Sequence, residues 1–483
     1  MPDSSSEFQN FHSVDFRHFI NSIFEQQSAY RKSCPFETLQ DRRARLGKLE
    51  KWILDNRSHI IEAIYSDFRK PPAETESQEI FLVLKEIRHA RRHLKKWMKR
   101  HPARRTLPLL TVRSWIEYVP KGIVLIISPW NFPFLLTAGP LISALAAGNC
   151  VIVKPSEFAP STARLVRKMV KDLFPEQEVA VVCGSKEAAS ELLKYPFDHI
   201  FFTGSSEVGK KVMYAAAQNL CPVTLELGGK SPAVVDETAN LKDAAQKIVW
   251  GKFFNAGQTC IAPDYVLAHE KIFLQLVDLM KNEIVNFYGK DQQEQMSSND
   301  FARIIDRRHF NRLKDLLRDA LNKNAHLETG SIPANSEKFI PPTILTDVNE
   351  NMKIMQEEIF GPILPVIDYQ TLEEAIDMIN RQSIPLAVYV FSGSKNSVKK
   401  VFLHTRSGSG AINEVVVQFI HPELPFGGRG KSGFGSSHGF YGFKTFSHEK
   451  SFVSGNRWTP VKLLYPPYSK FKKKMINTLI KFF

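Results

Sequence analysis

KGIVLIISPWNFPFLLTAGPLISALAAGNCVIVK, residues 121–154, is the stretch of sequence that decides the fold. Its interior holds 32 residues without a charge, which is long enough for a helix to cross a bilayer. Pro129, Pro133 and Pro140 oppose that interpretation, because proline breaks helical hydrogen bonding, and buried asparagine amides need partners in lipid. We therefore predict a buried β-α-β unit with a strand, a small-residue helix and a second strand at about 122–127, 137–147 and 150–154.

The same alternation continues downstream of this unit. Short apolar strands that alternate with helices predict a parallel, doubly wound sheet covered on both faces. Folds of this kind bind ligands at the carboxyl ends of their strands, so functional side chains are expected directly after each strand. The predicted strands are 179–183, 198–203 and 223–227, and the predicted helices are about 162–173, 186–193 and 207–218.

Length and composition indicate an ordinary globular protein. The chain has 483 residues, of which 43% are hydrophobic and 24% charged, so disorder and collagen-like repeats are excluded for most of it. The length favours two or three domains. Five cysteines without C-x-x-C spacing argue against a disulfide framework, and fourteen scattered histidines lead us to predict no metal. The N-terminal MPDSSSEFQN has no signal-peptide pattern, so we predict a cytoplasmic protein.

The net charge of +14 is concentrated in two segments. Residues 88–105 and 470–483 together hold fourteen basic side chains and no acidic one. The first segment has helical spacing, which is typical of the solvated face of an amphipathic helix. An anionic membrane surface or partner is the alternative. We predict no nucleic-acid binding, because no recognition motif accompanies the charge.

Polar residues follow the predicted strands. Asn131 lies between two prolines that fix the direction of its amide, although an ordinary turn would also use asparagine. Lys154 and Glu157 follow the second strand and suit the hydroxyl groups of a ribose. The segment 204–209, GSSEVG, opens a helix whose free N–H groups favour phosphate, but it does not match G-x-G-x-x-G and is equally well a plain helix cap.

Two further residues have side chains suited to catalysis. Glu226 lies between leucines beside a glycine pair, where burial would raise its pKa into the working range of a base; a salt-bridged strand end is the alternative. Cys260 follows a small-residue turn, FNAGQT, and is either a small core residue or a nucleophilic thiolate held near free N–H groups.

Together these segments resemble the aldehyde dehydrogenase superfamily over residues 35–468. PWNFP, KPSE, FTGSSEVG, LELGGKSP, FNAGQTC, EEIFGP and PFGG occur in the order of that family. The segments FNAGQTCIAPDY and YPPY are most similar to those of the class 3 and fatty aldehyde dehydrogenase branch. Arg429 departs from the family pattern, which usually has a small or apolar residue there, and its effect cannot be read from the sequence.

The resemblance implies roles for single residues. Cys260 would attack the aldehyde, Asn131 would hold the oxyanion together with the Cys260 N–H, and Glu226 would activate the water that releases the acid. The presence of Glu226 favours hydrolysis over transfer to coenzyme A. The cofactor is NAD or NADP; Glu157 should repel a 2′-phosphate, yet class 3 relatives often use both. The implied cofactor-binding residues are Lys154, Glu157, Gly204, Ser205, Gly209, Glu358 and Phe360.

The resemblance also implies the organisation of the chain, which is that of the aldehyde dehydrogenase fold: a Rossmann-like doubly wound sheet domain, an α/β catalytic domain and a small β oligomerisation element. We expect a dinucleotide-binding domain at 1–226, interrupted by an oligomerisation hairpin at about 101–121. A catalytic domain at 227–412 and a site-closing and dimerisation segment at 413–469 follow. The protein is expected to form a homodimer. A basic amphipathic tail occupies 470–483.

The tail and the substrate leave alternatives open. Phe471, Met475, Leu479 and Phe482 recur at helical spacing, in a segment too short to cross a bilayer. The tail could lie on an anionic membrane as a peripheral anchor, cap the substrate tunnel as in fatty aldehyde dehydrogenases, or be a frayed terminus. Medium- or long-chain aliphatic or other apolar aldehydes are the expected substrates, with aromatic and terpenoid aldehydes or a non-catalytic membrane-associated relative as alternatives.

Overall fold

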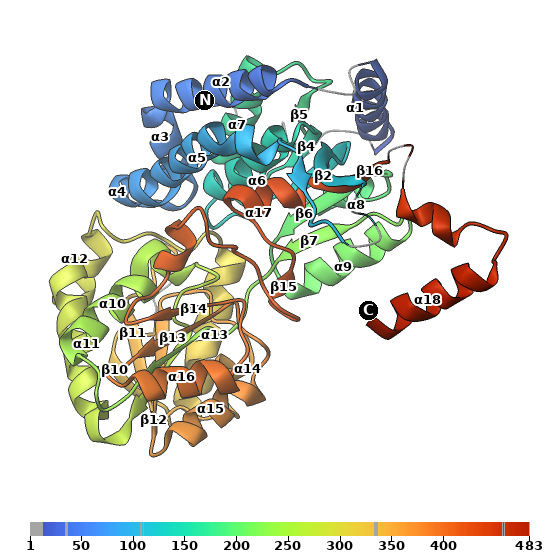
Figure 1. Ribbon diagram of the computed structural model, residues 1–483. Coiled ribbons are helices and arrows are strands. Elements are labelled where there is room, and N and C mark those ends of the chain that lie inside the picture. Colours follow the sequence, from blue (N-terminus) through green and yellow to red (C-terminus); the bar gives the residue numbers. More distant parts are fainter. Residues whose placement is uncertain are drawn as a thin grey trace.

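The computed structural model describes residues 13–482, apart from 34–36, 107–108, 110, 333–336, 456 and 458. Residues 1–12, on which the prediction of localisation rests, therefore lie outside the described part. Two α/β units and a small antiparallel sheet make up the described chain (Figure 1). The predicted fold class, a doubly wound parallel sheet domain joined to a second α/β domain and a small β element, is confirmed.

The first large sheet contains the β-α-β stretch of residues 121–154. Its strand order is β15-β7-β6-β3-β4-β5, and all pairs are parallel except β15 with β7. Every predicted element between 122 and 227 is present with ends within two residues of those expected. These elements are β3 (Ile123–Ile127), α6 (Leu135–Ala147), β4 (Cys150–Lys154), α7 (Pro160–Leu173), β5 (Val179–Val181), α8 (Lys186–Leu192), β6 (His199–Thr203), α9 (Ser206–Ala217) and β7 (Val223–Glu226). The remaining strand, β15 (Gly433–Phe434), comes from the C-terminal part of the chain and was not predicted.

The charge-free stretch is thus two buried strands around a helix of 13 residues, and the membrane-spanning alternative is wrong. The alternating side chains of β3 enter two separate cores. Val124 and Ile126 pack with α6 and α7 on one face, whereas Leu125 packs with α1, α8 and α9 on the other. Asn149 is buried, and its amide donates to two backbone carbonyls. Among the described residues no helix is long and apolar enough to cross a membrane.

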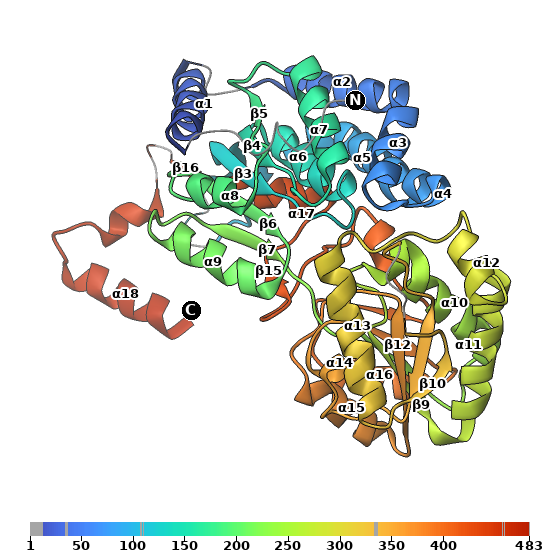
Figure 2. The ribbon, with the colours of Figure 1, turned by 180° about the vertical axis from the view of Figure 1, so that it is seen from behind.

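Five N-terminal helices pack over the first sheet (Figure 2). The basic segment predicted at 88–105 begins within α5, whose buried face carries Val83, Ile87 and Leu94. On the exposed face, Arg88 and Arg91 form ion pairs with Glu50. The helices are α1 (Ser13–Ser33), α2 (Leu39–Asp55), α3 (Arg57–Phe68), α4 (Pro72–Thr75) and α5 (Phe81–Trp97), with a π-helical turn at Glu76–Ile80 before α5.

The second large sheet has seven strands in the order β10-β11-β12-β9-β8-β13-β14. The chain enters it directly after β7, between Glu226 and Pro232, so the carboxyl end of the first sheet faces the second unit. The strands are β8 (Pro232–Val235), β9 (Tyr265–His269), β10 (His326–Thr329), β11 (Thr343–Thr346), β12 (Ile363–Tyr369), β13 (Ala387–Phe391) and β14 (Ser409–Ile412). The helices are α10 (Leu241–Phe253), α11 (Phe273–Tyr288), α12 (Gln292–Ser297), α13 (Arg307–Asn322), α14 (Lys353–Gln356), α15 (Leu372–Arg381) and α16 (Lys395–His404).

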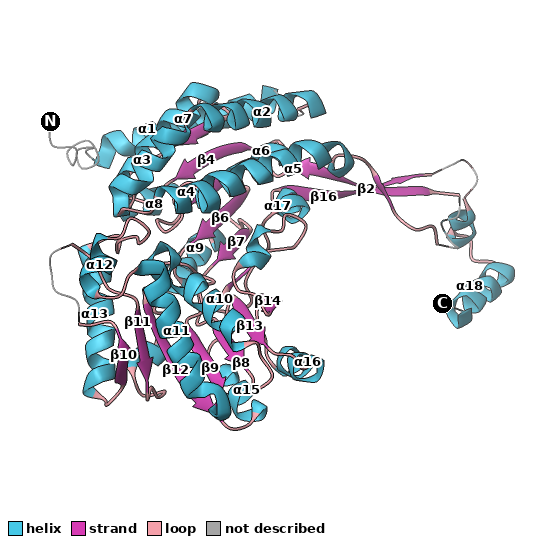
Figure 3. Cartoon of the chain, turned by 90° about the vertical axis from the view of Figure 1, so that its left-hand side faces the viewer, coloured by secondary structure: helices cyan, strands magenta, loops and turns pink. Residues whose placement is uncertain are grey.

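A three-stranded antiparallel sheet projects from the body as an arm (Figure 3). It comprises β1 (His101–Pro102), β2 (Arg113–Pro120) and β16 (Ser447–Ser454), so the hairpin expected at 101–121 takes its third strand from the C-terminal part. α17 (Gly439–Thr445) leads into β16, and α18 (Lys470–Phe482) lies beyond the arm. The domain boundaries at 226, 412 and 469 stay predictions.

A buried ion pair fixes the start of α6 against the N-terminal helices. Lys70 and Glu79 are fully buried, with their charged atoms 2.8 Å apart. The second carboxylate oxygen of Glu79 accepts the Phe134 and Leu135 N–H groups at 2.9 and 3.1 Å. Glu79 thus satisfies orphan donors at the helix start and complements the helix dipole.

Replacing Glu79 should therefore destabilise the protein strongly. Removing one partner of a buried ion pair costs about 3–5 kcal/mol. We expect Glu79→Ala to lower the thermal unfolding midpoint far more than Glu76→Ala, because the Glu76 pair with Arg57 is half exposed and contributes at most about 1 kcal/mol. Differential scanning calorimetry measures both shifts, and shifts of similar size would contradict this account.

Candidate active site

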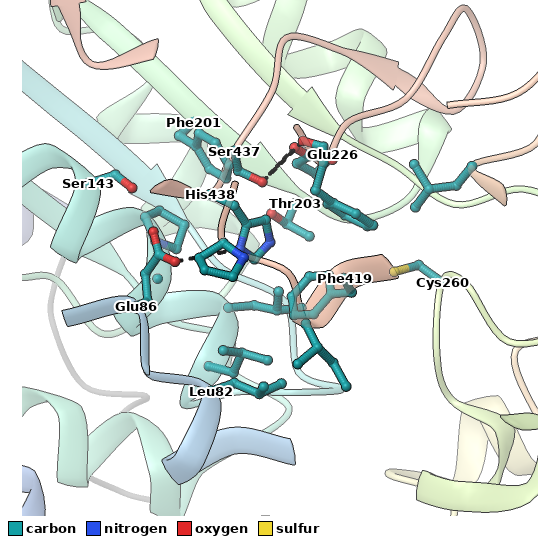
Figure 4. Close-up of a pocket in the computed structure, with 18 of the residues that line it drawn as sticks. Leu82, Glu86, Ser143, Phe201, Thr203, Glu226, Cys260, Phe419, Ser437 and His438 are labelled. Carbon is teal, nitrogen blue, oxygen red and sulfur yellow. Dashed lines mark hydrogen bonds and ion pairs between the residues drawn. The ribbon is translucent and has the colours of Figure 1, made fainter. Parts of the chain in front are cut away.

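Three cavities meet at Cys260, which lies on the loop between α10 and β9. One cavity, here called the rear cavity, is shared by Cys260 and Glu226 and extends toward α5 (Figure 4). A second, the apolar cavity, lies on the side of α4 and α10. A third, the polar cavity, lies at the carboxyl ends of β3 and β6. The structure thus brings the predicted residues Asn131, Glu226 and Cys260 together.

The loop that carries Cys260 has an unusual backbone. Asn255, Ala256 and Gly257 have φ angles of 53°, 52° and 72°. A side chain at Gly257 would place its Cβ 2.3 Å from the carbonyl oxygen of Gly361, so only glycine fits there. The buried Gln258 side chain donates to two backbone carbonyls and accepts one backbone N–H, which fixes the loop two residues before Cys260.

One buried lysine connects the segments that carry the candidate residues. Lys230, four residues after Glu226, forms an ion pair with Asp264, four residues after Cys260. Its ammonium group also donates to the carbonyls of Ile354 and Glu357 at 2.7 and 3.0 Å. The other oxygen of Asp264 accepts the N–H of the residue that follows Glu358, at 2.9 Å. Three loops are therefore held at one buried centre.

Glu226 is buried at the end of β7. Burial raises the pKa of its carboxyl group to about 8, and a hydrogen bond from Ser437 opposes part of that rise. The Ser437 hydroxyl donates to one carboxylate oxygen at 3.1 Å, while the second oxygen is buried without a hydrogen-bond partner. Within the described part of the chain, Glu226 forms no ion pair, so the alternative of a salt-bridged strand end is wrong. The expected rise in its pKa is found.

The Cys260 thiol has few groups to stabilise a negative charge. Burial raises its pKa well above the ordinary value, and the nearby carboxylates of Glu358 and Glu226 raise it further. Backbone N–H groups act in the opposite direction. The amide of Asn131, which is also buried, donates to the carbonyl of Gln258 at 3.1 Å and so lies beside the loop of the thiol.

The polar cavity has a volume of about 300 Å³ and includes most of the predicted cofactor-binding residues. Gly204, Ser205, Glu358 and Phe360 line it. Ser205 caps α9 by accepting the N–H of Val208 at 3.4 Å. One oxygen of Glu358 is buried without a hydrogen-bond partner.

The other predicted cofactor residues lie outside the lining of this cavity. Lys154, the last residue of β4, forms an ion pair of 2.5 Å with Glu157. Gly209 packs inside α9, where an added Cβ would lie 2.8 Å from the side chain of Leu227. Two lining residues, His309 and Arg312, were missed by sequence reasoning. Both come from α13, far along the chain, and no local pattern distinguishes them from other helical residues.

The apolar cavity also has a volume of about 300 Å³, and its lining is mostly aromatic and aliphatic. These residues were also missed, since apolar side chains that line a cavity have the same sequence pattern as core residues. The lining of the apolar cavity includes Phe132, Leu136, Trp250, Phe254, Val416 and Phe419.

Arg429 is exposed on a turn closed by Ser432, and nothing in the structure gives its side chain a function.

One group among the described residues has the arrangement of metal ligands. His89 and His93, one turn apart on α5, lie with Glu423 so that their ligand atoms are within 4.8 Å of one another. The histidines that the sequence analysis treated as scattered therefore include one pair with ligand spacing. Arg92 adds positive charge beside His89, which opposes cation binding. The absence of a metal stays a prediction.

The sequence was compared with known families and proteins. The model of the Aldehyde dehydrogenase family matches residues 5–452. The 4,4'-diaponeurosporen-aldehyde dehydrogenase of Staphylococcus aureus is 42% identical over 96% of this chain and 99% of its own length. Aldehyde dehydrogenase family 3 member A2 of Macaca fascicularis is 42% identical over 90% of this chain and 88% of its own length.

The fold was compared with solved structures. The substrate-bound state of Staphylococcus aureus AldH has a TM-score of 0.91 and 42% identity, and covers 95% of this chain and 99% of that one. The fold and the amino-acid sequence therefore indicate the same protein family. The resemblance to the class 3 and fatty aldehyde dehydrogenase branch is confirmed.

The electrostatics of the site predict how its thiol reacts. Above the Glu226 pKa of about 8 its carboxylate opposes ionisation of Cys260. Glu226→Gln removes that charge, so the pKa of Cys260 should fall and alkylation by iodoacetamide should be faster at alkaline pH. Mass spectrometry of the labelled Cys260 peptide measures the rate, with Glu237→Gln as an exposed control. An unchanged rate at every pH would contradict the electrostatic account.

Proposed function

Because the chain belongs to the aldehyde dehydrogenase family, we propose that Cys260, Glu226 and Asn131 carry out the reaction of that family where the three cavities meet. The protein is an NAD(P)⁺-dependent aldehyde dehydrogenase that converts an aldehyde to the carboxylic acid. The observation that carries the residue assignment is that Cys260 borders all three cavities while the buried Glu226 borders two of them.

The first step is nucleophilic attack by Cys260. After its S–H proton has left to solvent, the thiolate sulfur forms a bond to the aldehyde carbon, and the carbonyl electrons move to the oxygen to give the oxyanion of a thiohemiacetal. The oxyanion accepts hydrogen bonds from the Asn131 amide and the Cys260 N–H. Loss of such a donor typically lowers turnover by about 10²–10³-fold. The position of Asn131, buried beside the Gln258 carbonyl, supports this role.

The polar cavity fits a nicotinamide dinucleotide. The buried, unpartnered oxygen of Glu358 is an acceptor for ribose hydroxyls, and Gly228 leaves room beside it, since a Cβ there would lie 1.9 Å from the carboxylate. Ser205 at the start of α9 suits phosphate, with Gly204 beside it. When bound, the nicotinamide accepts the hydrogen and two electrons that leave the aldehyde carbon. Phe360 is assigned to the ring, with Lys154 and Glu157 near the adenine ribose.

Glu226 acts in the second half of the reaction. As a carboxylate it takes a proton from water while the water oxygen forms a bond to the thioester carbon. The carbon–sulfur bond then breaks, which releases the acid and returns Cys260. Burial is what gives this carboxyl group a pKa of about 8 and makes it a base near neutral pH. The presence of this base favours hydrolysis over transfer to coenzyme A.

We propose medium- or long-chain aliphatic or other apolar aldehydes as substrates. The apolar cavity leads to Cys260 between Phe132, Trp250 and Phe419, which suits chains or rings without charge. Aromatic and terpenoid aldehydes fit the same chemistry and stay as alternatives. A non-catalytic role is not favoured, because the nucleophile and the base are both present.

Two variants test the assignment of the nucleophile and the base. Cys260→Ala should abolish the formation of reduced nicotinamide, whereas Glu226→Gln should retain one burst per active site and then turn over about 10²–10⁴-fold more slowly. Stopped-flow absorbance measures both phases. Cys221→Ala, which replaces another buried free cysteine, serves as the control. Full turnover by Cys260→Ala, or a lost burst in Glu226→Gln, would refute the assignment.

We further propose that the arm joins two copies of the chain in a homodimer and that α18 binds anionic membrane. β16 is an edge strand of the described arm, and its Val453 is 67% exposed. On α18, Phe471 and Ile480 are about 70% exposed beside several lysines. The described residues of α18 line none of the three cavities of their own chain, so a cap on the tunnel would have to come from a partner.

The role of α18 can be tested with charge variants. Replacing Lys472, Lys473 and Lys474 by glutamine should weaken co-sedimentation with phosphatidylserine vesicles, because each basic residue contributes about 1 kcal/mol near such a surface. Oxidation of short aldehydes should be unaffected. The matched control replaces Lys95 and Lys96 on α5 together with Lys99, two residues after its end. Equal binding by both triple variants would argue against a membrane role for α18.

A further inference from the structure

The rear cavity contains a second buried carboxylate that the proposed mechanism does not use. The cavity extends from Glu226 and Cys260, between α5 and α6, to Lys85 and Glu86 on α5 (Figure 4). Its volume of about 60 Å³ exceeds the ~10–15 Å³ that one water molecule needs. The cavity that both glutamates border is therefore large enough to hold water molecules.

At the inner end, Glu226 has to lose a proton in every turnover. Hydrolysis leaves the proton of the attacking water on its carboxylate. Ser437 is the only described side chain hydrogen-bonded to Glu226, and a hydroxyl group can accept one proton while it donates another. The second oxygen of Glu226 has no hydrogen-bond partner among the described residues, so the Ser437 hydroxyl is the protein group through which its proton can leave.

At the outer end, Glu86 is buried but positioned for proton exchange. One of its oxygens accepts the Gly439 N–H at 2.6 Å, and the other lies 3.9 Å from Nδ1 of His438. Burial raises the pKa of Glu86 to about 7, and the hydrogen bond from Gly439 and the charge of Lys85 oppose part of that rise. The pKa of Glu86 is thus close to that of Glu226, so a proton passes between them at little cost.

His438 lies between the two carboxylates in Figure 4. Its backbone φ of 74° turns the chain there, and its ring packs edge-on against Phe419 and Phe426 with centroids 4.5 and 5.6 Å apart. Burial lowers the pKa of His438 to about 4, so the ring stays neutral near pH 7. The ring lies beside Glu86 without a hydrogen bond to it, and as a neutral group it does not take the proton itself.

We propose that Glu86 receives the proton of hydrolysis from Glu226, through the Ser437 hydroxyl and water in the rear cavity, and gives it to solvent beside Lys85. At Ser437 one O–H bond forms toward Glu226 as the other breaks toward water, and the water passes a proton to the Glu86 carboxylate. One proton moves and nothing is oxidised or reduced. This inference rests on the proposed role of Glu226 as the base.

Glu86→Gln is the variant that tests the pathway, because the amide oxygen can still accept the Gly439 N–H. The burst of reduced nicotinamide in the first turnover should be unchanged, whereas thioester hydrolysis should slow at least about tenfold, against the ~10²–10⁴-fold that a general base contributes. The solvent deuterium isotope effect on hydrolysis should increase. Rapid-quench analysis of the released acid measures the rate per active site.

Controls separate a proton pathway from a change in packing. Glu86→Asp should recover most of the rate, and added imidazole should accelerate Glu86→Gln. Asp67→Asn is the control, since Asp67 is half-buried, has a raised pKa and accepts backbone N–H groups at the start of α7. It should leave the rate and the isotope effect unchanged.

A second variant keeps the inference testable if Glu86→Gln folds poorly. Ser437→Ala interrupts the same path, so the double variant should be no slower than the slower single variant. Multiplicative effects, or hydrolysis at the wild-type rate and isotope effect in Glu86→Gln, would overturn the pathway. Hydrolysis at the wild-type rate in Glu226→Gln would instead refute the proposed role of Glu226 as the base, so the two failures are distinguishable.

Discussion

The buried ion pair between Lys230 and Asp264 is the interaction on which the site depends. Both side chains are buried, and a buried ion pair is tolerated only when further hydrogen bonds satisfy its remaining donors and acceptors. Here the remaining donors and acceptors bind backbone groups around Glu357 and Ile359. Since Glu226, Cys260 and Glu358 each lie within five residues of a member of this network, their relative positions follow from one desolvated centre.

Burial has two opposite effects at this centre. It raises the pKa of Glu226 to about 8, which suits a base near neutral pH, and it also raises the pKa of Cys260, which disfavours the thiolate that attacks. The adjacent carboxylates oppose a negative charge on sulfur, so protonation of Glu226 and Glu358 favours the nucleophile. Because both groups are desolvated and close together, the charge of Glu226 affects the pKa, and so the reactivity, of the Cys260 thiol.

The sequence predicted the first sheet well because each strand and helix there is a complete local pattern. The strands around α6 are apolar runs bounded by glycine, proline or asparagine, and their ends follow within two residues. Asn131, Glu226 and Cys260 were found for a similar reason, since each is a polar or reactive residue within a short local motif: between prolines, between leucines, or after a small-residue turn. His309, Arg312 and Phe419 lie in no local sequence motif of this kind, and tertiary packing alone brings them to the cavities.

The sequence by itself determined the family, the parallel sheet and the residues to which we assign the chemistry, because these depend on local periodicity and on short motifs. Only the tertiary structure decided what surrounds those residues. Glu86 and Ser437 are separated by some 350 positions, and no pattern in either segment indicates that both border one cavity behind Glu226. Desolvation is a property of that enclosure and not of any segment, which is why the pKa of Glu226 and the path open to its proton could be described only from the folded chain.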